Sequence, residues 1–396
     1  MKSENVPDKK RLLLLLALLT AFPPISIAMY LPAIPQLVEI WQQPLAVVNL
    51  TLVGFFVSYC VSLLVYGPLS DRFGRRRPLL AGIGLFIVAS LLCAGSTGVV
   101  GMIVLRVLQA AGAGAAATLA LAISKDVYAG HERERILAYI GVIMALAPML
   151  SPVFGGWIMT FFSWRWIFVA QGLFGVVAWI GVLRMPETLK KPSATGFFQT
   201  AGIYLQLFQN RRYVAMALLM SIVGLPHFAF IAGSTTIYIS DFGLTEQIYG
   251  YFFALNAAAL MAGAFVCTLL LRRMTSRGII TVGFAGILLG GTCLLLQWIE
   301  GPWGLALPMA MITFSVGLGR PPSNNLVLEQ VDRHAGAASS MLMFIYFMLG
   351  SFSMWLISLD WADKIRTIGI LGAGTGGIVL AIWLVVPGIS TRKKKG

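Results

Sequence analysis

The stretch Gly67-Pro-Leu-Ser-Asp-Arg-Phe-Gly74-Arg-Arg-Arg-Pro78 sets a cluster of charged residues between two long apolar runs. The runs cover residues 47–69 and 78–96. About twenty consecutive apolar residues are enough for an α-helix to cross the hydrocarbon core of a bilayer. The pattern therefore predicts two membrane-spanning helices joined by a short, strongly basic turn.

The composition of the whole chain indicates that lipid is its solvent. Of its 396 residues, 58% are hydrophobic and 11% are charged, whereas a soluble protein carries roughly 25% charged residues. The net charge of +14 would suit nucleic acid, but the basic residues lie in short clusters between apolar runs, as on the cytoplasmic face of membrane proteins. No nucleic acid partner is expected. The four cysteines, all within apolar runs, predict no metal site, cofactor or disulfide.

Runs of this kind recur along the chain and predict twelve spans. Their approximate limits are 11–32, 47–69, 78–96, 99–124, 135–160, 166–185, 213–237, 248–271, 279–298, 303–326, 335–359 and 365–387. The first run resembles a signal peptide, but no small-residue cleavage site ends it, so we interpret it as a retained helix. Most of the 29 lysines and arginines fall in the two termini and in alternate loops, which predicts that both termini are cytoplasmic.

The sequence also predicts two similar halves. The longest polar segment, 186–212, is the expected cytoplasmic linker between an N-terminal six-helix bundle, 1–185, and a C-terminal one, 213–396. Two charged loops recur about 200 residues later, Asp71–Arg77 as Arg272–Arg277 and Lys125–Arg135 near Glu329–His334. Equal offsets indicate a duplicated unit in parallel orientation, which is typical of transporters whose halves rock about a midplane site.

Several motifs together resemble those of a known family. The 67–78 stretch is similar to the signature loop of the major facilitator superfamily, Arg106–Gly114 to its fourth-helix motif, and Ala147–Gly156 to the fifth-helix motif of its drug/proton antiporters. Met29–Ala33 and Lys125–Tyr128 resemble the Bcr/CflA branch of multidrug efflux proteins. The resemblance implies an all-α integral membrane fold in the bacterial inner membrane, with twelve transmembrane helices in two pseudo-symmetric six-helix bundles.

The signature loop is expected to act as a latch. Glycine at 67 and 74 can let a tight turn join two antiparallel spans, and Asp71 can pair with the adjacent arginines. The resemblance implies that the outward-closed form is steadied by Gly67, Asp71, Arg72, Gly74, Arg75 and Arg76. The alternative is a simple turn with a basic anchor. Asp126, at the inner end of the fourth span, is expected to pair with an arginine of this loop, or else to be a solvated charge.

Arg106 is a charge inside a predicted span, where even a lenient insertion scale gives a cost of roughly 2.5–3.5 kcal/mol. It is expected to face the protein interior and to use Gln109, three residues on, as a polar partner. The resemblance implies that Arg106 takes part in proton or substrate coupling. A purely structural arginine, bonded to backbone carbonyls, is the alternative.

The fifth predicted span carries two prolines and two glycines at close spacing. Pro148 and Pro152 remove backbone donors from one face, and Gly155 and Gly156 permit close contact with another helix. The resemblance implies that this helix seals the cavity against leak. A packing kink alone explains the pattern equally well.

No acidic residue is expected at mid-membrane depth, because all fifteen Asp and Glu fall in loops, tails or span ends. Members of the Bcr/CflA branch usually carry an aspartate just before the Met-Tyr-Leu-Pro of the first helix, where this chain has Ala28. A bare cation in a medium of low dielectric is costly without a carboxylate partner. The cavity is therefore predicted to be neutral to positive and to prefer neutral or anionic compounds.

The C-terminal half offers two more candidates for coupling. His227, near the middle of the seventh span, could carry a proton or be a hydrogen-bonded packing residue. Arg320, in the tenth span, either lines the cavity or extends to water at the inner end. The remaining candidates for the substrate cavity are Ala28, Tyr30, Tyr59, Phe230 and Asn256.

These features predict a secondary active efflux transporter that exports drugs or xenobiotics by alternating access, in exchange for protons, as a monomer in the bilayer. One alternative is export of an endogenous metabolite such as a polycarboxylate siderophore. Another is an uncoupled or inactivated variant, because the first-helix acid is replaced by Ala28. A channel would not need duplicated latch loops, and an enzyme would need clustered nucleophiles, metal ligands or acids that the sequence lacks.

Overall fold

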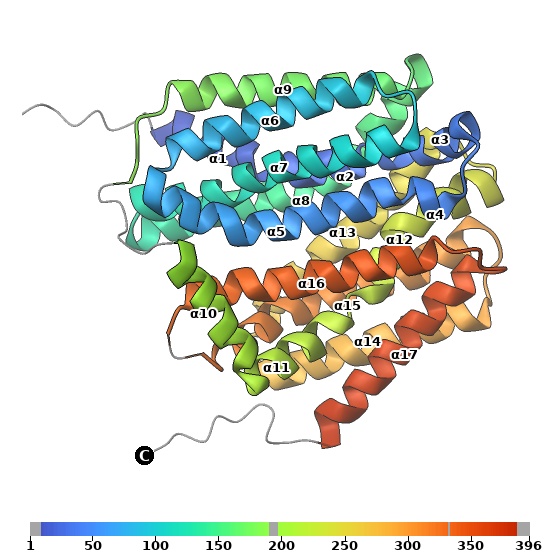
Figure 1. The fold of residues 1–396 in the computed structure, drawn as a ribbon. Coiled ribbons are helices and arrows are strands. Elements are labelled where there is room, and N and C mark those ends of the chain that lie inside the picture. The colour runs from blue at the N-terminus through green and yellow to red at the C-terminus, as the bar shows by residue number, and fades with distance from the viewer. Residues whose placement is uncertain (1–8, 190–196, 332, 386–396) are drawn as a thin grey trace, which may run out of the picture. The chain divides into compact units, whose positions relative to one another are not determined.

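The computed structural model describes residues 9–189, 197–331 and 333–385, and its regular elements are all helical (Figure 1). The helices up to residue 183 are α1 (Lys9–Thr20), α2 (Phe22–Ala28), the short 3-10 turn η1 (Leu31–Ala33), α3 (Ile34–Trp41), α4 (Leu45–Val48), α5 (Leu50–Phe73), α6 (Arg76–Ala94), α7 (Val99–Val127), α8 (Gly130–Phe161) and α9 (Arg165–Leu183). Those that follow are α10 (Phe197–Gln209), α11 (Arg211–Ile222), α12 (Leu225–Thr235), the π-helical turn η2 (Thr236–Asp241), α13 (Glu246–Leu270), α14 (Ser276–Leu296), α15 (Pro302–Leu328), α16 (Ala335–Ile357) and α17 (Lys364–Val385).

These helices form twelve segments that are long and apolar enough to cross a membrane, in agreement with the sequence prediction. The largest difference is in the first span, which was expected to end at residue 32 and continues to Trp41. Pro32 and Pro35 do not end it, because each lies at the start of a new helical turn, in η1 and α3, where a missing N–H costs no hydrogen bond. The predicted basic tails, 1–8 and 386–396, lie outside the described residues.

Contacts within the chain divide it into two compact units, each considered by itself. The first contains the residues up to Gln43 and then Leu50–Ala201, and the second contains Pro44–Asn49 and the residues from Gly202. The short segment 44–49 joins the second unit because the Asn49 amide donates to the Ala232 carbonyl at 3.2 Å and to the Ser358 hydroxyl at 2.7 Å. The sequence assigned this segment to the N-terminal bundle, since an amide contact so distant in sequence leaves no local pattern.

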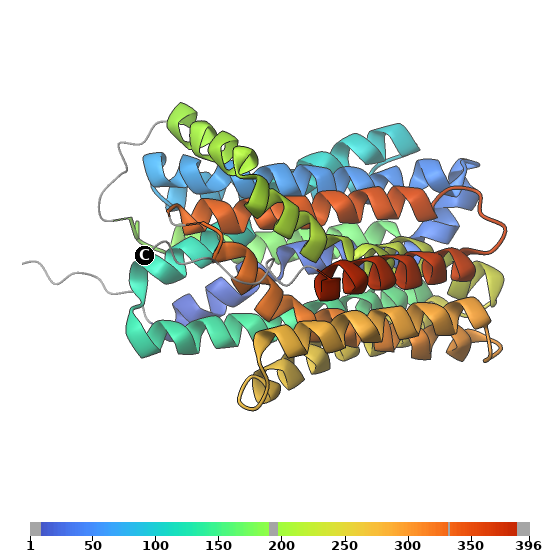
Figure 2. The ribbon, with the colours of Figure 1, turned by 90° about the horizontal axis from the view of Figure 1, so that it is seen from below.

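The two units repeat one packing scheme. In the first, α5 and α6 pack on α7, and α6 also packs on α9, as Figure 1 shows. In the second, α13 and α14 pack on α15, and α14 also packs on α17 (Figure 2). Spans two, three, four and six of one bundle thus correspond to spans eight, nine, ten and twelve of the other. The predicted fold class, two pseudo-symmetric six-helix bundles, is confirmed.

Local sequence determines where several spans begin. The side chains of Asn210, Thr245 and Thr275 accept backbone N–H groups of the first turns of α11, α13 and α14. Such caps satisfy donors that have no partner within the helix. In lipid this matters more than in water, because an unsatisfied backbone group costs several kcal/mol there.

The first and seventh spans are both broken. α1 gives way to α2 just before Pro23-Pro24, and α11 gives way to α12 at Val223-Gly224, just before Pro226. Proline lacks the N–H that would continue the ladder of hydrogen bonds. The two breaks are about 200 residues apart, which is the offset of the repeated loops. Interrupted spans at corresponding positions of two repeats indicate where a transporter binds its substrate.

Candidate functional site

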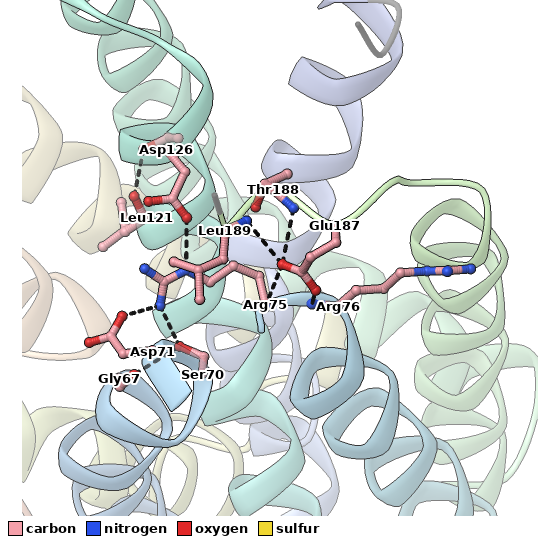
Figure 3. Close-up of polar contacts among 11 residues, drawn as sticks. Gly67, Ser70, Asp71, Arg75, Arg76, Leu121, Asp126, Glu187, Thr188 and Leu189 are labelled. Atoms are coloured by element: carbon pink, nitrogen blue, oxygen red, sulfur yellow. Dashed lines mark hydrogen bonds and ion pairs between the residues drawn. The ribbon is translucent and has the colours of Figure 1, made fainter. Parts of the chain in front are cut away.

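Figure 3 shows Arg75 at the centre of the signature loop, held by side chains from two helices. Its Nε donates to Oδ2 of Asp126 on α7 at 2.8 Å, and its Nη1 donates to Asp71 and, at 2.7 Å, to the hydroxyl of Ser70, both on α5. Burial would lower the pKa of Arg75, but the two carboxylates outweigh it and raise the pKa above its ordinary value. The expected pairing of Asp126 with a loop arginine is present and ties the ends of α5 and α7 together.

A third carboxylate, Glu187, holds the other side of the same loop. Its oxygens accept the backbone N–H groups of Arg75 at 2.8 Å and Arg76 at 3.1 Å, and those of Thr188 and Leu189 at 3.0 Å each (Figure 3). Partial burial would raise the pKa of Glu187, but these four donors outweigh it and lower the pKa below its ordinary value. Glu187 thus caps the N-terminus of α6, where a negative charge is favoured.

Glu187 was not among the residues predicted from the sequence. Its position in the sequence could have predicted this contact. Glu187 directly follows the sixth span and therefore lies at the membrane face that carries the signature loop. Gly74 lies against it with a φ of 87°, and a Cβ built there would approach Glu187 Oε2 to 2.5 Å. Glycine suits this turn because of its positive φ, and a Cβ there would also displace the Glu187 carboxylate.

Not all the predicted latch residues lie at the turn. Gly67 was expected to help form it and instead lies inside α5, with nothing near the place of a Cβ; one glycine at 74 suffices to reverse the chain. The exposed Arg72 lies over the ring of Phe73 at 5.4 Å. Arg76 donates to the carbonyls of Val182 and Leu183 at the end of α9, where a cation is favoured.

The second charged cluster lies inside the first unit and is built around Arg106, which is fully buried. Its guanidinium lies over three aromatic rings, 4.4 Å from the centroid of Phe55, 4.7 Å from Tyr30 and 5.9 Å from Phe168. Each such contact is worth about 0.5–2 kcal/mol. Three of them offset an insertion cost of roughly 2.5–3.5 kcal/mol, so aromatic faces take the place of a counter-ion.

Arg106 also enters a chain of amides. Its Nη1 donates to Oε1 of Gln109 at 2.6 Å, as the i, i+3 spacing predicts, and to the Ser26 carbonyl of α2 at 3.0 Å. Gln109 in turn donates to Ser90 and Gln171, both at 2.8 Å. The network joins four spans and ends on a carbonyl beside the break in the first span. Gln171 is a further polar residue that the sequence analysis did not single out.

Arg106 has no carboxylate partner in the described structure. Its Nε and Nη2 are buried without any hydrogen-bond partner among those residues. Unmade bonds of a buried group are costly, so the aromatic contacts of Arg106 are what offset this cost in the described structure. Ala28, at the position of the missing acid, is a buried methyl side chain.

The antiporter-motif helix, α8, packs against the same region of the first span. A Cβ at Gly155 would approach the Met29 carbonyl to 2.3 Å, so only glycine lets the two backbones meet here. Pro148 and Pro152 lie inside α8, and Gly156 follows Gly155 within it. Close packing against the first span therefore explains Gly155 without any role in sealing the cavity against leak.

The candidates of the second unit lie on three helices, α12, α13 and α15. Arg320 lies 3.8 Å over the ring of Tyr346 and lines a pocket with it. Nδ1 of His227 is buried without a hydrogen-bond partner among the described residues. Asn256 accepts from Thr313 at 2.9 Å, and Phe230 stacks on Phe253 at 5.8 Å.

Among the first-unit candidates, Tyr30 belongs to the Arg106 cluster, and its hydroxyl is 3.0 Å from that of Thr51. Tyr59 lies on α5 and packs near Gly114 of α7. No group of His, Cys, Asp and Glu suited to a metal ion occurs in the described ranges. Around Arg106 the buried polar groups are therefore amides, hydroxyls and a backbone carbonyl.

Residues 16–354 match the Major Facilitator Superfamily. The chain belongs to this superfamily. It is therefore a multi-pass membrane transporter and not an enzyme. The resemblance to the Bcr/CflA branch is also confirmed, because curated relatives include bicyclomycin, chloramphenicol and multidrug resistance proteins.

Three superfamily members illustrate how far the similarity extends. An uncharacterized MFS-type transporter, YdgK, from Bacillus subtilis is 29% identical over 90% of this chain and 91% of its own length. A bicyclomycin resistance protein homolog from Haemophilus influenzae is 27% identical over 86% of each chain. The crystal structure of a D-xylose-proton symporter superposes with a TM-score of 0.73 at 14% identity, covering 94% of this chain and 97% of the other; this likeness shows the fold alone.

Proposed function

We propose that this protein exports drug-like small molecules by alternating access, in exchange for protons, and that its interior selects neutral or anionic compounds. The two moving parts are the six-helix bundles 1–185 and 213–396, joined by the linker 186–212. Both termini face the cytoplasm, and the protein works as a monomer. Its relatives are named for resistance to bicyclomycin and to chloramphenicol, which supports export of antibiotics.

The observation that carries the substrate preference is the unpaired guanidinium of Arg106. Every acid of the described spans lies within five residues of a helix end, so no carboxylate meets a cation at depth. Bringing a second positive charge near Arg106 in a medium of low dielectric costs several kcal/mol. A neutral compound avoids this repulsion, and an anion can use the free Nε and Nη2 of Arg106.

The signature loop supplies the latch of this cycle. Arg75 joins the ends of α5 and α7 through Asp71 and Asp126, and Glu187 joins the loop to the segment after α9. Because the carboxylates are half-exposed or at helix ends, the bonds can open without stranding a charge in lipid. Asp126 and His227 are the residues proposed to carry the proton.

A second candidate, an uncoupled transporter, is favoured by one observation. Position 28 holds a buried methyl group, and no described acidic residue lies near the middle of the first span. Such a protein would move its substrate down a gradient without moving protons.

Everted membrane vesicles separate these functions. A dye that reports the acid interior is followed while bicyclomycin, ethidium and citrate are added in turn, and labelled bicyclomycin is followed in parallel. Proton release on adding bicyclomycin supports proton-coupled export. Movement of labelled bicyclomycin without proton release identifies the uncoupled form. Proton release with ethidium alone contradicts the proposed selectivity.

A further inference from the structure

We infer that the pocket around Arg320 in the second unit is a subsite for the anionic group of an otherwise apolar molecule, such as a carboxylate on an aromatic ring. The inference rests on the proposed transport function and names the substrate class that this unit recognises. The inference is based on a half-buried cation that lines a partly enclosed pocket with no acidic residue in its wall.

Arg320 is turned into the pocket and does not extend along the helix to water. Its guanidinium stacks on Tyr346 at 3.8 Å, and its Nη2 lies 3.6 Å from the sulfur of Met343, both on α16. The inner end of α15 is eight residues further on, which is about 12 Å along a helix. Among the described residues no carboxylate pairs with Arg320, so its contact with the Met343 sulfur is the one side-chain hydrogen bond that a ligand would compete with in that part of the chain.

Hydroxyl and amide groups surround the cation. Ser221, Ser323 and Asn324 line the same pocket, and the two serines are almost fully buried. None of the three side chains makes a hydrogen bond within the part of the chain that the structure describes. A carboxylate accepts several such bonds together with a guanidinium, so the polar wall is matched to an anion and lacks partners of its own.

Apart from Ser315, the rest of the wall is apolar, and the space is small. Phe284, Ile287, Val316 and Leu342 belong to it, and the volume of about 20 Å³ is far below the roughly 300–1,000 Å³ of a pocket for a whole drug. A charged head group fits this description better than an entire substrate. The apolar body of the molecule would then extend beyond the enclosed part.

The pocket adjoins the break in the seventh span. Met220, Ser221 and Val223 lie directly before Gly224, where a Cβ would approach the ring of Tyr346 to 2.7 Å. Glycine at the break thus allows the ring that supports Arg320 to come close. Interrupted helices of repeated bundles are the usual place for a transporter's binding groups, so the position agrees with a role in recognition.

The test uses the purified full-length protein and a pair of probes of equal shape, 2-naphthoate and its neutral amide. We expect 2-naphthoate to raise the midpoint of thermal unfolding and 2-naphthamide to leave it unchanged. For Arg320→Gln, the naphthoate concentration that gives half of the shift should rise about tenfold or more, because a charge-assisted bond is lost. Arg320→Lys should fall between the two proteins.

The matched control is Arg277→Gln, since Arg277 also lies over an aromatic ring, that of Trp383 at 5.5 Å, but is outside the pocket. It should respond to naphthoate as the unchanged protein does. An equal shift with both probes, no shift with naphthoate, or an undiminished shift in Arg320→Gln overturns the inference. Displacement of naphthoate by a short-chain phosphatidylglycerol supports a lipid head group as the source of the anion, and failure to displace it supports a soluble substrate.

The naphthoate binding test and the bicyclomycin export test can fail independently of each other. A protein that exports bicyclomycin but does not bind naphthoate contradicts the subsite and leaves the proposed function intact. A protein that binds naphthoate through Arg320 but exports nothing contradicts the proposed function alone.

Discussion

Arg75 and Arg106 lie in the same bundle and are both buried, yet they are held in opposite ways. Arg75, at the helix ends, has carboxylates on two sides and a third at its backbone. Arg106, inside the bundle, has aromatic rings, one amide and one carbonyl. Ion pairs are thus placed where water can replace a broken partner, whereas the interior keeps a cation without a counter-ion. This contrast supports the proposal that the interior selects neutral or negative molecules.

The largest expected effect comes from changing how Arg106 is held while its charge is kept. Arg106→Lys retains the charge but loses the planar group that faces three rings. Because each cation–π contact is worth about 0.5–2 kcal/mol, we expect efflux of a neutral antibiotic to fall about tenfold or more at equal protein level. Arg165→Lys is the control, since Arg165 is exposed and lies 4.5 Å from the centroid of the Trp164 ring. Full activity of Arg106→Lys would show that charge alone matters.

A smaller effect is expected at the turn that presents Arg75. Gly74→Ala adds a Cβ at a φ of 87°, against a Glu187 oxygen, and should cost about 1–3 kcal/mol of stability. Gly130→Ala provides the comparison, because Gly130 also has a positive φ, 53°, but nothing near its Cβ. Thermal unfolding should rank Gly74→Ala as the less stable of the two. Equal losses would mean that Glu187 does not constrain the loop.

The two carboxylates of Arg75 should differ in strength. The Asp126 side chain is 17% exposed and that of Asp71 is 47% exposed. A double-mutant cycle between Arg75 and Asp126 should give a coupling of roughly 1–3 kcal/mol, and the cycle with Asp71 about 0–1 kcal/mol, as for other exposed pairs. A stronger coupling to Asp71 would mean that the latch holds the end of α5 more firmly than the end of α7.

The smallest effect is a pH dependence. The pKa of Glu187 lies below its ordinary value of 4.5, so its contribution to stability is fully present above pH 4.5 and is lost as pH falls through the lower, folded-state pKa. The unfolding midpoint of Glu187→Gln should therefore be slightly lower at pH 7 and should decline less below pH 4.5. Parallel curves for the two proteins would exclude a contribution from the ionised carboxylate.

Sequence patterns predicted the features that depend on the length of apolar runs and on the positions of charged residues along the chain. Run length and basic loops were enough for twelve spans in two bundles, and the spacing of Arg106 and Gln109 was enough for their contact. The Asp126 pairing followed from two charged motifs at helix ends. Each of these features follows from a short stretch of sequence or from the repetition of such a stretch.

Other features depend on contacts between distant segments and had no such pattern. Glu187 returns to the signature loop only because α9 runs back beside α6, and Asn49 joins the second unit through an amide. Gly67 has the residue type of a turn but lies in a helix whose backbone needs no special conformation there. The paired breaks at Pro23 and Pro226 were visible in the sequence as an offset of about 200 residues and could have been used to place the binding region.

Ethidium efflux tests most directly whether an interior without carboxylates rejects cations. It is measured in cells that produce either the unchanged protein or Ala28→Asp, and efflux of a neutral antibiotic is measured alongside. We expect the unchanged protein to export the antibiotic and not ethidium, and Ala28→Asp to gain ethidium efflux, since the new carboxylate can balance the cation. Ethidium efflux by the unchanged protein at the rate of the neutral antibiotic would contradict this expectation.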